Sequence, residues 1–472
     1  MIEARRRQRS FAEGFIIEEV DEFWDDWMRA VDPVLDDDDL VATVYEALGK
    51  RRAQSRTRGR LGFPAEVVLR MLLLKHIRHW SFAILEREVR TNLLYREFTR
   101  VRGGKVPDAK TLGRLAQAVG PEVVATLHQR VVAIAQERKV IAGRKARVDT
   151  TVVETNIHYP TDSSLLGDGV RVLTRLMKKV TAIAGQVGAK LRDRRRSVNY
   201  RLMEIGRASR DKRAQGQAML KTRYQKLLAT TGRVVGQAQR FITELATGVK
   251  SSADVKQQAA LDSLKKELAV MVPRVQQVMR QTKARVLEGN THVAGKLVSL
   301  FEPTTEIIRK GKASKPTEFG KLVKIQEAEH QIIIDYEVYA QRPSDSDLLV
   351  PALQVHQQRL GRVPDLVAAD AGFYSAAAET TVKAMGVKRV SVPNRSTKSA
   401  QRKQEQKKRW FKQGQKWRTG CEGRISLLKR RHGLNRCRYI GDAGMKRWVG
   451  LGVIGDNLIN LGLALARAKT PS

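Results

Sequence analysis

The segment from residue 170 to residue 288 contains almost no proline or aromatic residues and is rich in Ala, Gln, Lys, Arg, Leu and Val. Its apolar residues recur every three to four positions, for example in VVGQAQRFITELATGV, and this spacing predicts amphipathic helices. We expect two or three long helices that form a coiled-coil-like arm. Because strand-like sequence occurs on both sides of this segment, we expect one sheet to be built around a helical insertion.

The strand-like sequence begins with RVDTTVVETN, where β-branched residues alternate with a period of two around Asp149. Three more strand-like segments lie between residues 297 and 341, and helices and strands then alternate. We therefore expect an α/β fold (α+β overall), with a mixed sheet flanked by helices. The expected domains are a helical N-terminal domain for DNA binding or dimerisation (1–140), the sheet domain (141–170 and 291–472) and the helical insertion (171–290).

The N-terminal region changes the sign of its charge near residue 50. Residues 11–49 carry thirteen acidic residues, and Arg29 is their only Lys or Arg. The helices predicted there either shield basic surface until DNA arrives or expose a solvated face. The basic sequence after Arg51 predicts two helices joined by a tight turn, between Pro64 and Phe98, with basic residues on their outer faces. Such a pair can read a major groove, although helix pairs in bundles have the same pattern.

The composition indicates a polyanionic partner. The chain has 88 Lys and Arg against 49 Asp and Glu, a formal net charge of +39. Such a charge opposes compaction unless a polyanion neutralises it, so we expect nucleic acid as the partner. The only cysteines, Cys421 and Cys437, lack the spacing of a zinc finger or of a disulfide framework. The apolar run over residues 448–468 is interrupted by one Asp and two Asn, which predicts a buried helix and no membrane span.

Three carboxylates are candidates for chemistry. Asp149 lies in a strand, where Asp is depleted and where its burial requires a cationic partner. Asp370 ends the apolar strand DLVAAD, and sites concentrate at the ends of strands in open α/β sheets. Glu422 lies on a predicted basic helix, where alone it would be read as a neutralising charge. Together, two strand-borne Asp and one helix-borne Glu can hold two Mg²⁺ ions about 3.5–4 Å apart.

The layout of these residues resembles that of the DDE transposases of bacterial insertion sequences, which carry a ribonuclease H-like catalytic domain. One branch of that family has the signature Tyr-x2-Arg-x3-Glu-x6-Lys around its third carboxylate. This chain has Arg418, Glu422 and Lys429 at that spacing, and Gln415 in place of the Tyr. The run FPAEVVLRMLLLKHIRHWSFAILEREVR also resembles the helical domain that precedes the catalytic core in many of these enzymes.

Asp149 within DTT resembles the first motif of that family, and Asp370 within ADAGFYS resembles the second. The resemblance implies that these two residues and Glu422 are the catalytic metal ligands for two Mg²⁺ ions, for which Mn²⁺ would substitute. The expected DNA-binding residues are Arg418, Lys429 and Arg424.

The resemblance further implies a transposase that binds terminal inverted repeats, cleaves the DNA ends and joins the 3′-hydroxyls to target DNA. A homodimer would hold both ends in a synaptic complex, with the helical insertion as a clamp. We expect it in the bacterial cytoplasm, associated with the nucleoid when DNA is bound, and with no membrane partner. Two alternatives stay open, because carboxylates alone do not separate them: a ribonuclease H-like nuclease without strand transfer, and a catalytically inactive DNA-binding protein.

Overall fold

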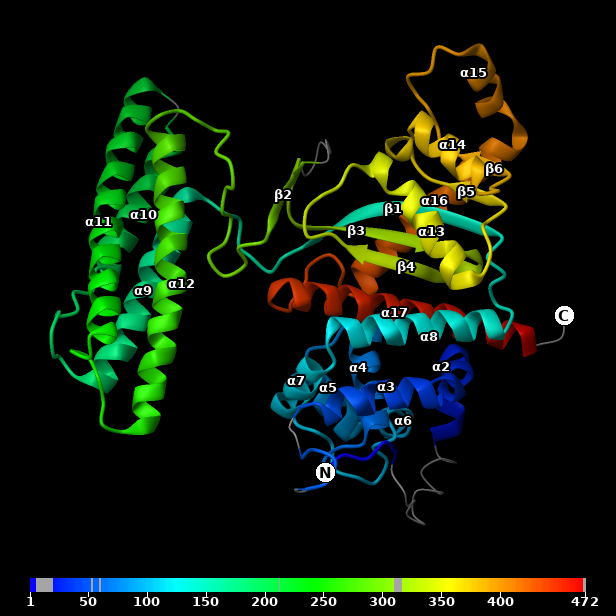
Figure 1. The fold of residues 1–472 in the computed structure, drawn as a ribbon, viewed down its shortest axis with the longest axis horizontal. Helices are drawn as coiled ribbons and strands as arrows, with labels where there is room; N and C mark the ends of the chain where they lie inside the picture. The colour runs from blue at the N-terminus through cyan, green and yellow to red at the C-terminus, as the bar shows by residue number, and fades with distance from the viewer. Residues whose placement is uncertain (6–19, 52–53, 59–60, 212, 310–315, 470–472) are drawn as a thin grey trace. The chain divides into compact units, whose positions relative to one another are not determined.

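The computed structural model describes residues 1–5, 20–51, 54–58, 61–211, 213–309 and 316–469 (Figure 1). The chain divides into two compact units, Met1–Asn156 with Ile308–Ser472 and Ile157–Ile307. The first unit contains the sheet and the N-terminal helices, and the second is the helical arm. The boundary near residue 140 between an N-terminal domain and the sheet domain stays a prediction.

A mixed six-stranded sheet lies at the centre of the first unit. Its strands are β1 (Lys145–Glu154), β2 (Glu306–Arg309), β3 (Thr317–Glu327), β4 (Ile333–Val338), β5 (Leu366–Ala368) and β6 (Arg389–Ser391). The order is β2-β3-β1-β5-β6, and β4 also pairs with β3. Strand β1 is antiparallel to β3 and parallel to β5, which is parallel to β6. The expected fold class is confirmed, and the sheet is consistent with a ribonuclease H-like domain.

Helices cover both faces of this sheet (Figure 1). On one face, α13 (Leu349–Leu360) and α14 (Ala376–Ala384) share an apolar core with Val148 of β1. On the other face, α16 (Arg409–Arg431) packs against β1, β5 and β6. Two glycines allow helix α16 to approach the sheet closely. A Cβ at Gly414 would lie 2.6 Å from the hydroxyl of Ser391, and one at Gly420 would collide with Arg147. A short helix, α15 (Ala400–Lys407), precedes it.

The C-terminal helix α17 (Gly441–Lys469) confirms the prediction of a buried helix. Among the described residues it alone is long and apolar enough to span a membrane, and 67% of its most apolar window is buried. Its polar residues have partners inside the core: Asn457 both accepts from the backbone N–H and donates to the carbonyl of Ile333, each at 2.8 Å. These contacts bind α17 to β4.

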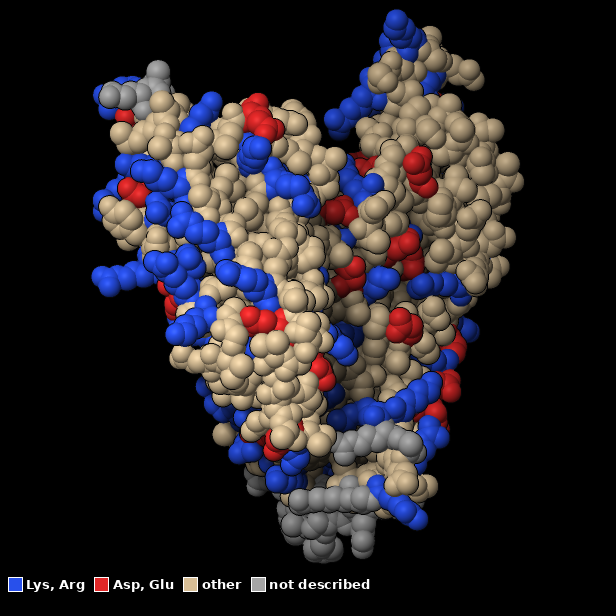
Figure 2. Space-filling view, turned by 60° about the vertical axis from the view of Figure 1, so that its left-hand side comes forward, with Lys and Arg blue, Asp and Glu red and all other residues tan. Residues whose placement is uncertain are grey.

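The second unit is a bundle with its own apolar core. Within the described residues it has four helices, not two or three: α9 (Asp162–Ala184), α10 (Arg195–Ala208), α11 (Ala214–Ala246) and α12 (Val255–Val286). Helix α9 begins at Asp162, directly after Thr161, because Thr161 and Ser164 form a capping box at its start. Figure 2 shows Lys and Arg side chains spread over the face of the arm that is turned forward.

The N-terminal helices surround α4, which is buried along its whole length. The expectation that the basic residues of this helix face outward is therefore wrong. The second predicted helix is divided at Asn92, whose side chain caps α6. The helices are α2 (Asp26–Val31), α3 (Asp38–Gly49), α4 (Ala65–Ile77), α5 (Phe82–Thr91), α6 (Leu93–Phe98), α7 (Ala109–Ala118) and α8 (Pro121–Glu137).

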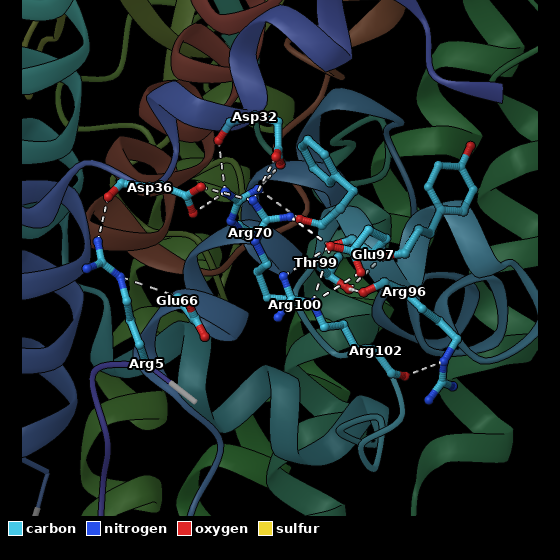
Figure 3. Close-up of polar contacts among 12 residues, drawn as sticks. Arg5, Asp32, Asp36, Glu66, Arg70, Arg96, Glu97, Thr99, Arg100 and Arg102 are labelled. Carbon is cyan, nitrogen blue, oxygen red and sulfur yellow. Dashed lines mark hydrogen bonds and ion pairs between the residues drawn. The ribbon is translucent and has the colours of Figure 1, made fainter. Parts of the chain in front are cut away.

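A network of ion pairs joins the acidic segment to these helices (Figure 3). The fully buried guanidinium of Arg70 contacts Asp32 at 2.6 Å and Asp36 at 2.7 Å. Arg100 contacts the same two carboxylates at 2.7 and 3.0 Å. Buried charges persist only when they are paired in this way. The acidic residues of this part of the chain therefore have a structural role, and the contacts do not support a shield that DNA displaces.

Lys75 of α4 lies in a cage of aromatic rings. Its ammonium is 5.0 Å from the ring centre of Phe82, 5.2 Å from that of Tyr439 and 4.9 Å from that of Trp448. These rings favour the charged form. Burial acts in the opposite direction and, with the nearby charge of Arg438, lowers the pKa of Lys75 from its usual 10.5 to about 8.

We expect the stability of the protein to rise with pH above pH 8 because of Lys75. Between pH 8 and 10.5 the unfolded chain binds this proton and the folded chain does not, so unfolding becomes less favourable as pH increases. From pH 7 to 9.5 the free energy of unfolding should increase by about 2 kcal/mol relative to Lys75→Met. Urea unfolding of both proteins at the two pH values measures this difference. Parallel pH profiles would show that Lys75 does not titrate in this range.

Candidate active site

The parallel pairing of β1 with β5 brings Asp149 and Asp370 to the same level of the sheet. Lys145, Ala146 and Arg147 pair with Leu366, Val367 and Ala368, and this register, continued for two residues, aligns Asp149 with Asp370. Adjacent strands lie about 4.8 Å apart. The carboxylate of Asp149 is 14% exposed, and Asp370 is half-buried. Both acids are thus accessible from solvent, Asp149 within β1 and Asp370 just after the carboxyl end of β5.

Asp370 also fixes the turn that follows β5. Its Oδ1 accepts a hydrogen bond of 2.9 Å from the backbone N–H of Gly372, in the short helix η5 (Ala371–Phe373). A Cβ at Gly372 would lie 3.2 Å from this oxygen and 3.5 Å from a carboxylate oxygen of Asp345. Asp345 in turn accepts a hydrogen bond from the hydroxyl of Thr150, which follows Asp149. Asp345 is thus a further carboxylate next to the turn that carries Asp370. Asp345 was not among the candidates from the sequence, because only the folded chain brings it close.

Helix α16 brings Glu422 to β1 through an arginine. The Nη1 atom of Arg418 lies 2.9 Å from Oε1 of Glu422 and 3.8 Å from Oδ2 of Asp149. Glu422 is exposed (60%), whereas Arg418 is largely buried (14%). One guanidinium nitrogen therefore connects the strand-borne and the helix-borne carboxylates.

Gln415, at the position where the resembling signature has Tyr, anchors α16 to the sheet. Its amide nitrogen donates to the carbonyls of Ser391 at 2.5 Å and Ala369 at 3.2 Å. These carbonyls lie at the ends of β6 and β5. The side chain at this position therefore holds the helix one turn from Arg418, and a Tyr is not required for that contact.

A buried ion pair supports the helix beneath this site. Arg147 contacts Glu327, its cross-strand partner on β3, at 2.5 Å and donates to the carbonyl of Trp417 at 2.6 Å. Burial raises the pKa of Glu327 even though Arg147 lowers it. Burial, with the negative charges of Glu327 and Asp149, also raises the pKa of the Cys421 thiol. This pair was not predicted from the sequence, because it depends on the residue-by-residue register of β1 with β3 across the insertion.

The three predicted DNA-binding residues differ in their surroundings. Arg418, Glu422 and Lys429 share one face of α16, because positions i, i+4 and i+11 differ by about 40° or less around a helix. Arg424 is turned about 120° away from Arg418. It is 4% exposed and contacts both oxygens of Asp456, at 2.9 and 3.2 Å. Its guanidinium therefore joins α16 to α17, and we do not retain it as a DNA contact.

The oxygen donors at this site suit a hard divalent cation, which prefers carboxylates and completes its shell with water or phosphate oxygens. In the described residues, however, no three His, Cys, Asp or Glu side chains are near enough to one another to hold one ion. Arg418 instead contacts two of the predicted ligands. The residue types fit Mg²⁺, and the side chain of Arg418 would have to move away from Asp149 and Glu422 for the ions to bind.

Comparison with known families gives two matches. The model described as a transposase domain (DUF772) matches residues 18–118, which cover the N-terminal helices through α7. The model described as a transposase DDE domain matches residues 379–462, which include α16 with Glu422. Asp149 and Asp370 lie outside both ranges. Neither the curated proteins nor the solved structures contain a match to the chain.

Proposed function

Because the chain belongs to the DDE transposases of insertion sequences, we propose that it binds the terminal inverted repeats of its element, cleaves the DNA ends and joins the 3′-hydroxyls to target DNA. The observation that carries this proposal is the meeting of three segments: β1, the residues that follow β5, and α16. The β1–β5 register aligns Asp149 with Asp370, and Arg418 connects Asp149 to Glu422. A site of this kind suits phosphoryl transfer, because the protein contributes mainly positioning and electrostatic stabilisation to that reaction.

We assign Asp149, Asp370 and Glu422 as the residues that would hold two Mg²⁺ ions, with Mn²⁺ as a substitute. Bound Mg²⁺ would activate the attacking oxygen and stabilise the leaving oxygen. The aligned strands fix the two Asp side chains before any ion arrives, whereas exposed Glu422 on α16 is free to adjust. This combination supports a site that is partly preformed.

Arg418 and Lys429 would contact the phosphates beside the cleavage point. A guanidinium can form paired hydrogen bonds with a phosphate, and an ammonium acts as a point charge. Their common helix face with Glu422 supports this role. We propose that Arg418 leaves Asp149 for a DNA phosphate when the site is loaded, so that an arginine which neutralises the carboxylates in the free protein becomes a substrate contact.

We further propose that a homodimer holds two DNA ends in synapsis, since both ends must be joined together. The protein would act in the cytoplasm, on the nucleoid. One helix, α17, has the length and composition of a membrane span, but it is packed in the core of the first unit. Its contacts favour a role in the core.

A strand-transfer assay tests the proposal. The substrates are duplexes that carry the ends of the element encoding the chain, uncut in one set and pre-cleaved in the other, with a supercoiled plasmid as target and Mg²⁺ in the buffer. We expect joined products that link the 3′-ends to the plasmid. Cut ends without any joined product would instead support a ribonuclease H-like nuclease. DNA binding without cutting or joining would support an inactive DNA-binding protein.

A further inference from the structure

The helical arm carries 28 Lys and Arg against 12 Asp and Glu between residues 157 and 307. Part of this excess gathers in one place. Arg192 and Arg194 lie just before α10, and Arg233 and Arg240 lie on α11. The pKa of Arg194 is lowered by its burial and by the positive charges of the other three. Arg194 thus lies close enough to the other three guanidinium groups to be affected by their charge, and we call the four residues the arm arginine cluster.

The loop that carries two of these arginines is fastened to α11. The buried amide of Gln237 donates to the carbonyl of Lys190 at 2.5 Å, and Glu244 accepts from the backbone N–H of Ala189 at 2.7 Å. The buried ammonium of Lys250 donates to the carbonyl of Val187. These contacts hold the loop in place, so the cluster is organised before any ligand binds.

Gln237 also sets the position of the loop relative to the arginines of α11. Positions 233, 237 and 240 lie on one face of a helix, at i, i+4 and i+7. The carbonyl of Lys190 therefore contacts α11 between Arg233 and Arg240. The loop arginines that follow reach the same face.

The acidic residues near the cluster are engaged elsewhere. Asp193 contacts Arg195 at 2.7 Å and Lys178 at 2.9 Å, and Glu244 contacts Lys250 at 3.4 Å. In the part of the arm that the structure describes, no carboxylate forms an ion pair with any of the four clustered arginines. Like charges that repel one another without a counter-ion destabilise the folded protein, and an anionic ligand would relieve this repulsion.

We propose that the arm arginine cluster, Arg192, Arg194, Arg233 and Arg240, binds the phosphate backbone of double-stranded DNA. The choice of DNA rests on the proposed function. The extent of the cluster supports it, because Arg233 and Arg240 lie two turns apart, roughly 10 Å along the helix axis. A row of that length suits a polymer of phosphates better than one small anion. Three of the four side chains are exposed, and Arg194 is half-buried.

The salt dependence of DNA binding tests this site in the full-length protein. The probe is a 30-base-pair duplex of arbitrary sequence, and fluorescence anisotropy gives the dissociation constant between 50 and 300 mM salt. Each phosphate contact contributes roughly −0.9 to the slope of log K against log salt. For Arg233→Ala/Arg240→Ala we expect a slope smaller in magnitude by roughly two and affinity lower by about tenfold at 0.1 M salt. A second duplex of unrelated sequence should give the same loss.

Lys221→Ala/Lys256→Ala is the matched control, because both lysines are exposed on arm helices and do not act on Arg194. It removes the same charge and should leave the slope within about 0.5 of the wild-type value. Arg233→Lys/Arg240→Lys keeps the charge and should keep most of the slope. This result would show that the loss of slope in Arg233→Ala/Arg240→Ala comes from the lost charge.

Equal effects of the two alanine pairs, or an unchanged slope for Arg233→Ala/Arg240→Ala, would overturn the arm site. Both results leave the proposed transposition untouched. Conversely, the predicted loss of slope in Arg233→Ala/Arg240→Ala, together with a wild-type protein that neither cuts nor joins DNA, would support the arm site and contradict the proposed function.

Discussion

Asp149→Asn and Asp370→Asn are each expected to reduce DNA cleavage by roughly a thousandfold or more, while DNA affinity stays the same or increases. Each change keeps the shape of the side chain but removes an anionic oxygen, from β1 in one variant and from the turn after β5 in the other. A neutral amide is a poor ligand for a divalent cation, and its loss of charge also reduces the repulsion of DNA phosphates. Single-turnover cleavage and anisotropy on the same duplex measure the two effects separately.

Asp365→Asn is the matched control for this prediction. Asp365 lies just before β5, whereas Asp370 lies after it, and the carboxylate of Asp365 contacts Lys388 at 3.1 Å and Arg362 at 3.0 Å. Cleavage by this variant should stay within about twofold of wild type, since surface ion pairs contribute little. Wild-type cleavage rates for Asp149→Asn, or an equal loss for Asp365→Asn, would show that Asp149 and Asp370 are not catalytic.

Much of the fold follows from local patterns in the sequence. The strand around Asp149 was predictable because β-branched residues alternate there, and α17 because an apolar run with one Asp and two Asn suits a core better than a bilayer. The burial of α4 was not predictable from the same patterns. An apolar stripe with a few basic residues is typical of a surface helix, and only Asp32 and Asp36, far away in sequence, allow Arg70 to be buried.

The candidate site was predictable only in part, for a similar reason. The spacing of Arg418 and Glu422 indicates a shared helix face, and the structure has them in contact. The same periodicity places Arg424 on another face of the helix. The sequence alone could therefore have indicated that Arg424 does not lie beside Arg418 and Glu422. Arg147 with Glu327, and Asp345 beside Asp370, depend on tertiary pairing. The assignment of the three carboxylates to metal ions stays a prediction that the cleavage assay tests.

The second large effect concerns stability. Asp456→Ala is expected to lower the free energy of unfolding by roughly 3–5 kcal/mol, because it leaves the guanidinium of Arg424 buried without its partner. Arg424 and Asp456 are each 4% exposed, and His432 lies 3.5 Å from the same carboxylate. Urea unfolding monitored by circular dichroism measures the change. Asp365→Ala, which breaks only surface ion pairs, should leave the urea midpoint close to that of wild type.

The double variant Arg424→Met/Asp456→Met separates a structural role of Arg424 from DNA binding. Replacing both partners of a buried ion pair with apolar side chains of similar size is often nearly neutral, so we expect the double variant to recover most of the stability lost in Asp456→Ala. Its DNA affinity and salt slope should equal those of wild type, because α16 still presents Arg418 and Lys429 on its other face. If the double variant were stable but its salt slope fell by about one, Arg424 would contact a phosphate. In that case α16 would have to turn or separate from α17 when DNA binds.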